Sequence, residues 1–147
     1  MVTWQNWGRT YTAHPLSIET PATEGEIVAI VTAAAAAGER VKVAGSGHSF
    51  TDAACTDGRL LKLDRYNRLL NVDAAAGLAT VQAGITITAL TEALAQFGLT
   101  LENQGDVAYQ TISGAISTAT HGTGEGFRNI SSQVRGVRLV TGSGDVV

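Results

Sequence analysis

The stretch VAGSGHSFTDAACTDG, residues 43–58, constrains the fold most, because a β-type run ends there in two glycines that flank a serine and precede a histidine. The pattern RVKVAG predicts a short strand that stops at Gly45. Consecutive backbone N–H groups from Gly45 to Ser49 can form a concavity that binds an anion such as a pyrophosphate, and glycine allows the required backbone shape. His48 would then lie beside the ligand, where an imidazole can act as a nucleophile or a hydrogen-bond partner.

Two other interpretations of this loop fail on its residues. The dinucleotide pattern G-x-G-x-x-G needs a third glycine where Phe50 stands, and TDAACTDG behind it is typical of a turn rather than a helix. A nucleophile elbow, G-x-S-x-G, would need a glycine where Ala44 stands. A turn without chemical meaning would suffice for an isolated Gly-Ser-Gly, so it is the histidine that favours a binding loop.

The elements around this loop predict a mixture of helices and strands. Residues 23–40, TEGEIVAIVTAAAAAGER, predict a helix that begins with a capping box of Thr23 and Glu26 and ends at Gly38. Three short strands in an antiparallel meander are predicted at RLLKLD (59–64), RLLNVD (68–73) and GLATVQAG (77–84).

A second helix is predicted over residues 86–98, with Thr86 or Thr88 as its N-cap and Gly98 as its end. Its apolar stripe is expected to contain Leu90, Leu94 and Phe97. A short helix is expected around residues 111–118. The final residues, QVRGVRLVTGSGDVV, predict a strand, a TGSG turn and the start of a returning strand, so we expect the chain to be a fragment of a longer protein.

A second glycine-flanked histidine lies in STATHGTGEG, residues 117–126. Its small residues, the hydroxyls of Thr118 and Thr120, and His121 suit the close approach of backbone to a ligand. A helix end packed tightly against a sheet explains the same pattern equally well. Two such loops in one chain favour a single long ligand that both contact.

Composition limits the partners. The net charge of −3 and the 16% of charged residues provide no general attraction to nucleic acid or anionic lipid, so a phosphate would have to be held by local backbone groups. Trp4 and Trp7 are therefore interpreted as packing residues rather than a platform for stacked bases. No metal site is predicted, because the three histidines and Cys55 lack the spacing of metal ligands.

The same sequence predicts a cytoplasmic protein. It contains no signal-peptide pattern and no apolar run long enough to cross a membrane. Cys55 is the only cysteine, so no internal disulfide can form and a reducing compartment is favoured.

Taken together and in this order, NW near the start, VAGSGHSFTDAACTDG, LENQGD and TISGAISTATHGTG resemble the N-terminal FAD-binding domain of the vanillyl-alcohol oxidase or p-cresol methylhydroxylase (PCMH) class of flavoproteins. Within that class the chain is similar to the sugar-lactone oxidases, which include the L-gulonolactone and D-arabinonolactone oxidases, and to alditol oxidase. The resemblance implies an α+β fold over residues 1–147, a PCMH-type FAD-binding domain truncated at its C-terminus. A small α/β subdomain is expected at about residues 15–65, the start of a mostly antiparallel subdomain at about 66–147, and the substrate-binding domain is absent.

The resemblance also implies FAD as the cofactor and two sets of contact residues. The first set wraps the pyrophosphate and reaches the flavin: Gly45, Ser46, Gly47, His48, Ser49 and Phe50. The second set contacts the cofactor elsewhere: Gly105, Asp106, Thr111, Gly114, Thr118, Ala119, Thr120 and His121. In covalent members the histidine of the first loop is bonded through a ring nitrogen to the 8α-methyl group of the isoalloxazine, so His48 is the expected attachment point. Such a bond would raise the tendency of the flavin to accept electrons.

The implied reaction oxidises the CH–OH group of a sugar lactone or an alditol. Hydride would pass to flavin N5, and oxygen or another acceptor would take the electrons; Gly105 stands where the family has a small residue near the oxygen-reactive face. The fragment would then be a cofactor module without a complete active site, and no catalytic residue is assigned in it. Two alternatives stay open: a non-catalytic nucleotide-binding domain, and a structural domain whose glycines serve turns only.

Overall fold

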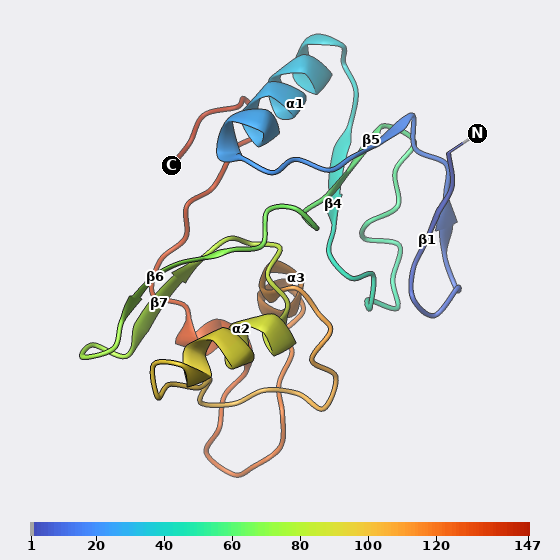
Figure 1. Ribbon diagram of the computed structural model, residues 1–147. Helices are drawn as coiled ribbons and strands as arrows, with labels where there is room; N and C mark the ends of the chain where they lie inside the picture. The colour runs from blue at the N-terminus through green and yellow to red at the C-terminus, as the bar shows by residue number, and fades with distance from the viewer. Residues whose placement is uncertain (1) are drawn as a thin grey trace. The chain divides into compact units, whose positions relative to one another are not determined.

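The computed structural model describes residues 2–147, which form two compact units (Figure 1). The first unit contains the chain up to Arg65 together with Gly136–Val147, and the second contains Tyr66–Arg135. The first unit has one cluster of buried apolar residues and the second has two, and each unit is described separately.

A three-stranded parallel sheet forms the centre of the first unit. Its strands lie in the order β3 (Ser17–Glu19), β5 (Arg59–Lys62) and β4 (Val41–Ala44). Leu60 of β5 pairs with Ile18 on one side and Lys42 on the other, and it is fully buried. The prediction that RLLKLD begins an antiparallel meander is therefore wrong. Parallel neighbours need a long crossover connection, and residues 45–58 provide it between β4 and β5. We call this connection the histidine loop.

Helix α1 (Glu24–Ala36) connects β3 to β4, and its predicted capping residues act nearly as expected. Thr23 is the N-cap, and its side chain accepts a hydrogen bond from the backbone N–H of Glu26 at 3.2 Å. The carboxylate of Glu26 accepts from the N–H of Ala22 at 2.7 Å rather than from Thr23 itself. Gly38, with φ of +67°, follows the helix in the left-handed conformation that glycine adopts without strain.

Two further pairings complete this unit. β1 (Trp4–Gln5) and β2 (Thr12–Ala13) form an antiparallel hairpin that was not predicted. Trp4 and Ala13 pack with Ala44 and Leu60 in the buried cluster. The predicted C-terminal turn is confirmed, because Leu139 and Val147 exchange two backbone hydrogen bonds of 2.8 and 2.9 Å around it.

The second unit joins a β-hairpin to three helical segments. β6 (Leu69–Asp73) pairs antiparallel with β7 (Leu78–Val81), as predicted. The helical segments are α2 (Ile87–Ala95), α3 (Ile112–Ser117) and the 3-10 helix η1 (Ile130–Gln133). Ile87, Ala115 and Ile130, one from each, are buried against one another.

Helix α2 confirms its predicted start but not its predicted stripe. Thr86 is the N-cap, and its side chain accepts from the N–H of Ala89 at 3.2 Å. Leu90 and Leu94 are buried, whereas Phe97 is 49% exposed. The placement of Phe97 on the stripe is wrong, because the helix ends before that residue can continue the buried face.

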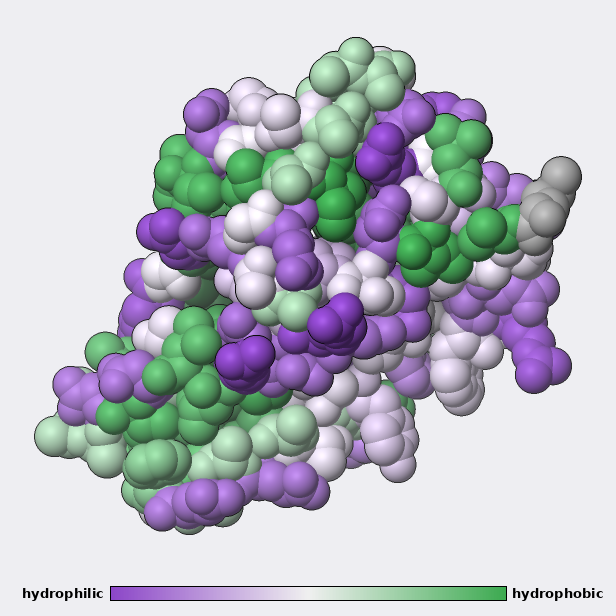
Figure 2. Space-filling model, turned by 45° about the horizontal axis from the view of Figure 1, so that its top comes forward, coloured by the Kyte–Doolittle hydropathy of each residue, from purple (hydrophilic) through white to green (hydrophobic). Residues whose placement is uncertain are grey.

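The surface mixes residue types. On the face drawn in Figure 2, hydrophobic residues form separate patches among hydrophilic ones. Within residues 2–147, no helix is both long and apolar enough to span a bilayer.

Candidate cofactor site

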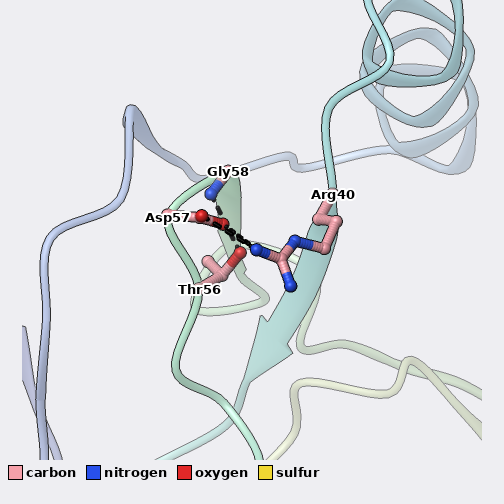
Figure 3. Close-up of polar contacts among 4 residues, drawn as sticks. All are labelled: Arg40, Thr56, Asp57 and Gly58. Atoms are coloured by element: carbon pink, nitrogen blue, oxygen red, sulfur yellow. Dashed lines mark hydrogen bonds and ion pairs between the residues drawn. The ribbon is translucent and has the colours of Figure 1, made fainter.

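The histidine loop is fastened where it enters β5. Arg59 donates its backbone N–H to the carbonyl oxygen of Arg40 at 2.7 Å, and a Cβ at Gly58 would overlap that same oxygen. The guanidinium of Arg40 also contacts both carboxylate oxygens of Asp57 at 2.8 Å, while Thr56 accepts from the N–H of Gly58 at 3.0 Å (Figure 3). The end of the loop is thus held against the start of β4.

Near its start, the loop is held through the carbonyl groups of residues 47 and 49. Trp7 donates its backbone N–H to the carbonyl oxygen of Gly47 at 2.9 Å, and the side-chain amide of Asn6 donates to that of Ser49 at 3.0 Å. The backbone N–H groups of Gly47, His48 and Ser49, in contrast, donate no hydrogen bond within the described part of the chain. A backbone with its carbonyls satisfied by the protein and its N–H groups left available fits an anionic ligand such as a pyrophosphate.

Glycine is needed in this backbone. Gly47 has a φ of +72°, which L side chains rarely adopt, and a Cβ there would lie 3.5 Å from the backbone nitrogen of Trp7. The loop can therefore come close to the N-terminal turn at Asn6 and Trp7 and still leave the N–H groups of residues 47–49 without an acceptor among residues 2–147.

The indole of Trp7 contacts His48, and the ring of Phe50 contacts that indole. The indole of Trp7 stacks on the imidazole with a centroid distance of 4.8 Å and an interplanar angle of 20°. Phe50 meets the indole edge-on at 6.3 Å. Trp7 and Phe50 are both 64% exposed, so this cluster lies at the surface with the half-buried imidazole against it. The interpretation of Trp4 and Trp7 as packing residues holds for buried Trp4, but it missed the contact of Trp7 with the histidine.

The second set of predicted residues lies in the second unit, where two segments run against each other. A Cβ at Gly122 would overlap the carbonyl oxygen of Gln104 and the side chain of Asn103. A Cβ at Gly105 would lie 3.2 Å from the carbonyl oxygen of His121. The glycines at 105 and 122 thus permit close packing of the protein's own backbone, which is the structural explanation that the sequence left open for this loop.

Thr111, Gly114, Thr118 and Thr120 are brought together around α3. Thr111 is the N-cap, is 4% exposed, and accepts from the N–H of Gly114 at 3.3 Å. The hydroxyl of Thr118 donates to the carbonyl oxygen of Gly114 at 3.0 Å and lies 3.2 Å from the hydroxyl of Thr120. Ala119 between them has a φ of +52°, a strained value for an alanine.

His121 and Asp106 are more exposed members of this set. The Nδ1–H of His121 donates to the carbonyl oxygen of Gly122 at 2.8 Å, which orients the ring. The carboxylate of Asp106 makes no hydrogen bond or ion pair with any other residue in the range 2–147. No interaction of this side chain within the described residues supports or opposes its predicted contact with the cofactor.

Sequence reasoning gave no role at the site to Asn6 and Trp7, although the pair NW was one of the signatures of the resemblance. No signal in the sequence marks their contacts with the loop, because the burial of Asn6 and the exposure of Trp7 are visible only in the structure.

A surface hollow of about 410 Å³ on the first unit offers no better site. It is lined by Thr12, Ala13, His14, Arg40, Cys55, Thr56 and Asp57. None of these is a predicted cofactor residue, and its two fully charged groups, Arg40 and Asp57, already pair with each other. Among residues 2–147, no group of three or more histidine, cysteine or acidic residues could hold a metal ion.

Comparison with known proteins supports the resemblance. A family model described as "FAD binding domain" matches residues 15–147. An L-gulono-1,4-lactone dehydrogenase of Mycobacterium tuberculosis (strain ATCC 25618 / H37Rv) is 48% identical over 98% of this chain and 34% of its own length. An L-gulonolactone oxidase of Mus musculus is 38% identical over 99% of this chain and 33% of its own length. The chain thus spans about a third of the curated relatives that it matches.

Solved structures agree on the fold. The 6-hydroxy-D-nicotine oxidase of Arthrobacter nicotinovorans superposes with a TM-score of 0.76 at 26% identity, over 88% of this chain and 29% of that chain. A solvent-stable cholesterol oxidase superposes with a TM-score of 0.73 at 28% identity, over 82% of this chain and 24% of that chain. The α+β class and the FAD cofactor expected from the sequence are confirmed. With a family match that extends from Pro15 to the last residue, and relatives that align over nearly its whole length, this chain belongs to the FAD-binding domain family.

Proposed function

We propose that this chain is the FAD-binding part of an oxidoreductase that oxidises the CH–OH group of a sugar lactone or an alditol. The observation that carries the proposal is the pattern of the histidine loop. The carbonyl oxygens of Gly47 and Ser49 are bound by the N-terminal turn, while three successive N–H groups beside them have no acceptor among residues 2–147. This is the chemistry that a diphosphate requires in a protein with a net charge of −3.

In this proposal the histidine loop binds the diphosphate by its backbone. Gly45, Ser46, Gly47, Ser49 and Phe50 provide N–H groups and a shape that brings main chain close to the ligand. Glycine at position 47 is necessary because of its left-handed backbone conformation. A side chain there would strain the loop and move its N–H groups.

A further set of cofactor contacts is proposed within the second unit, from short side chains and backbone. We assign this role to Gly105, Asp106, Thr111, Gly114, Thr118, Ala119, Thr120 and His121. The support is that hydroxyls of Thr118 and Thr120 lie 3.2 Å apart at the end of α3, next to the strained backbone of Ala119. Strained residues of this kind concentrate at ligand sites.

His48 is the proposed point of covalent attachment. It is half-buried, its ring stacks on the indole of Trp7, and its backbone N–H is one of the three that have no acceptor among residues 2–147. FAD held by these residues would supply the redox chemistry for oxidising a CH–OH group, with oxygen or another compound as the final electron acceptor. No residue of this chain is assigned to bind the substrate.

The absorption spectrum tests the cofactor assignment. The chain should carry flavin absorbance, and the flavin should stay with the protein after acid precipitation. A His48→Ala variant should release it into the supernatant, whereas the matched variant His14→Ala, at an exposed histidine of the same unit, should not. Flavin that precipitates with His48→Ala contradicts the attachment. ADP or ATP that stabilises the chain without any bound flavin would instead favour the nucleotide-binding alternative.

The substrate class has its own test. The flavin-loaded protein that contains this chain is mixed without oxygen with L-gulono-1,4-lactone, D-arabinono-1,4-lactone or a linear alditol. Loss of the oxidised flavin absorbance with one of these compounds is the expected result. An unchanged spectrum with all three would contradict the proposed substrate class and leave the cofactor assignment intact.

A further inference from the structure

Asn6 and Trp7 form a turn that contacts the histidine loop at three successive residues. The side-chain amide of Asn6 donates to the carbonyl oxygen of Ser49, 43 positions away. The backbone of Trp7 donates to Gly47, and its indole stacks on His48. These three contacts fall on the segment whose backbone N–H groups have no acceptor among residues 2–147, and the edge-on contact of the Trp7 indole with Phe50 lies one residue beyond it.

The side chain of Asn6 forms hydrogen bonds both within the turn and to the loop, so it couples the conformations of these two segments. It is 3% exposed, and both its amide hydrogens and its carbonyl oxygen are used. The side-chain nitrogen donates to Thr10 at 2.9 Å as well as to the loop, and the side-chain oxygen accepts from the N–H of Tyr11 at 3.0 Å. A buried polar group with every partner present specifies one geometry, because loss of any partner leaves an unpaired group away from water.

Trp7 differs from Asn6 because burial does not explain its position. Its side chain is 64% exposed, so removal from water provides little of the reason for its orientation. Its contacts with the loop are the backbone hydrogen bond to Gly47, the stacked imidazole and the edge-on ring of Phe50. A stacked ring restricts rotation of the imidazole about its side-chain bonds, and an aromatic pair of this kind stabilises one orientation over others.

We infer that Asn6 and Trp7 are positioning residues for the cofactor. The turn holds the histidine loop in the conformation that leaves its N–H groups available, and the indole of Trp7 sets the plane of the His48 imidazole. This inference rests on the proposed function, in which the loop binds FAD. Neither residue is assigned a contact with the reacting atoms.

The expected effect on binding follows from pre-organisation. If the loop reaches its binding conformation for only part of the time, the apparent affinity falls by that fraction. Loss of an aromatic pair alone weakens FAD binding by roughly three- to tenfold. Because Trp7 is mostly exposed, its variants should fold as the wild type does.

The first measurement needs no cofactor. In the proton NMR spectrum of the full chain, the ring protons of His48 should lie upfield of those of His14 and His121, since the face of an indole shields protons above it. A His48→Gln variant assigns the signal. Trp7→Ala should return the His48 resonance to the range of the other two histidines, Trp7→Phe should keep part of the shift, and Phe97→Ala, at an exposed aromatic residue of the second unit, should leave it unchanged.

The second measurement is the dissociation constant of the reversible complex that the apoprotein forms with FAD before any bond to His48, compared among variants with an unchanged melting temperature. Trp7→Ala should bind more weakly by the factor given above, Trp7→Phe should recover most of the loss, and Phe97→Ala should match the wild type. Asn6→Ala should weaken binding too, and if it fails to fold, the Trp7 series decides by itself.

Two results would overturn the inference. One is a His48 resonance that Trp7→Ala does not move; the other is a resonance that moves while FAD affinity stays at the wild-type value. A wild-type chain that does not bind FAD would contradict the proposed function and, with it, the role of the turn in cofactor binding. The NMR comparison would still show whether the turn orders the loop, so the two failures are distinguishable.

Discussion

Arg138 donates two hydrogen bonds to the carboxylate of Glu24, 114 positions earlier, at 2.6 and 3.0 Å. The pair fastens Gly136–Val147 to the first turn of α1 within the first unit. Hydrogen bonding to this guanidinium lowers the pKa of Glu24 below its ordinary value of 4.5. The ionised carboxylate is thus stabilised in the folded chain relative to the unfolded one.

This pair predicts a pH dependence of stability. Because the folded pKa is the lower one, the contribution of Glu24 is fully present above about pH 4.5 and is lost as the pH falls through the folded value. Glu24→Gln should lower the free energy of unfolding at pH 7, and the difference from wild type should shrink at acidic pH. Urea denaturation at a series of pH values measures it. Glu92→Gln, at an exposed glutamate of α2, is the control, and a difference as large at pH 3 as at pH 7 would contradict the assignment.

Alanine substitutions at Gly122 and Gly105 should lower the free energy of unfolding by different amounts. An alanine at 122 would overlap the carbonyl oxygen of Gln104, so the backbone must move, whereas an alanine at 105 would meet the carbonyl oxygen of His121 at 3.2 Å, which asks for a smaller shift. Gly122→Ala should reduce the free energy of unfolding by about 3 kcal/mol and Gly105→Ala by about 1 kcal/mol. Gly136→Ala, where a Cβ meets nothing within 4 Å, should be close to neutral. Equal unfolding midpoints for the three variants would show that the two segments are not in close contact in solution.

Thr111 carries a prediction for α3. Its hydroxyl is the cap of the first turn, so Thr111→Ala should destabilise the chain by about 1 kcal/mol, and Thr111→Ser should restore most of that loss. Hydrogen exchange of the amide of Gly114, which bonds to that hydroxyl, reports the cap directly. Thr100→Ala, at an exposed threonine of the same unit, should change neither quantity. A Ser variant as unstable as the Ala variant would mean that the methyl group of Thr111, not its hydroxyl, is what the fold needs.

Local signals predicted local structure well. Thr23 and Gly38 bound α1, and Thr86 begins α2, because a cap depends only on residues within one turn. The direction of β5 was not predictable in this way. RLLKLD has the same pattern in a parallel or an antiparallel pair, and its neighbours in the sheet come from before α1 and from before the histidine loop.

At the site, too, local features could be predicted from the sequence and long-range contacts could not. The glycines and histidine of the loop identify a backbone made for close approach, and this was visible in one short stretch. The contacts that shape it come from Asn6 and Trp7, 40 or more positions away, in a hairpin whose strands have two residues each. Strands that short show no periodicity, so only the structure could pair that turn with the loop.

The histidine loop ends at Asp57 and Gly58, and Asp57 pairs there with Arg40. Substitutions at these two neighbouring loop positions should differ strongly in their effect on the free energy of unfolding. The side chains of Arg40 and Asp57 are 75% and 72% exposed, so water screens their attraction, and Asp57→Asn should cost no more than about 1 kcal/mol. Gly58 is buried, and a Cβ there would overlap the carbonyl oxygen of Arg40 that accepts the N–H of Arg59. Gly58→Ala should therefore cost about 3 kcal/mol by forcing β4 and β5 apart. Urea denaturation compares the two, with Gly142→Ala, where a Cβ meets nothing within 4 Å, as the control for the substitution itself. If Asp57→Asn were the more damaging change, the loop would be held by its ion pair and not by the close approach of backbone at Gly58.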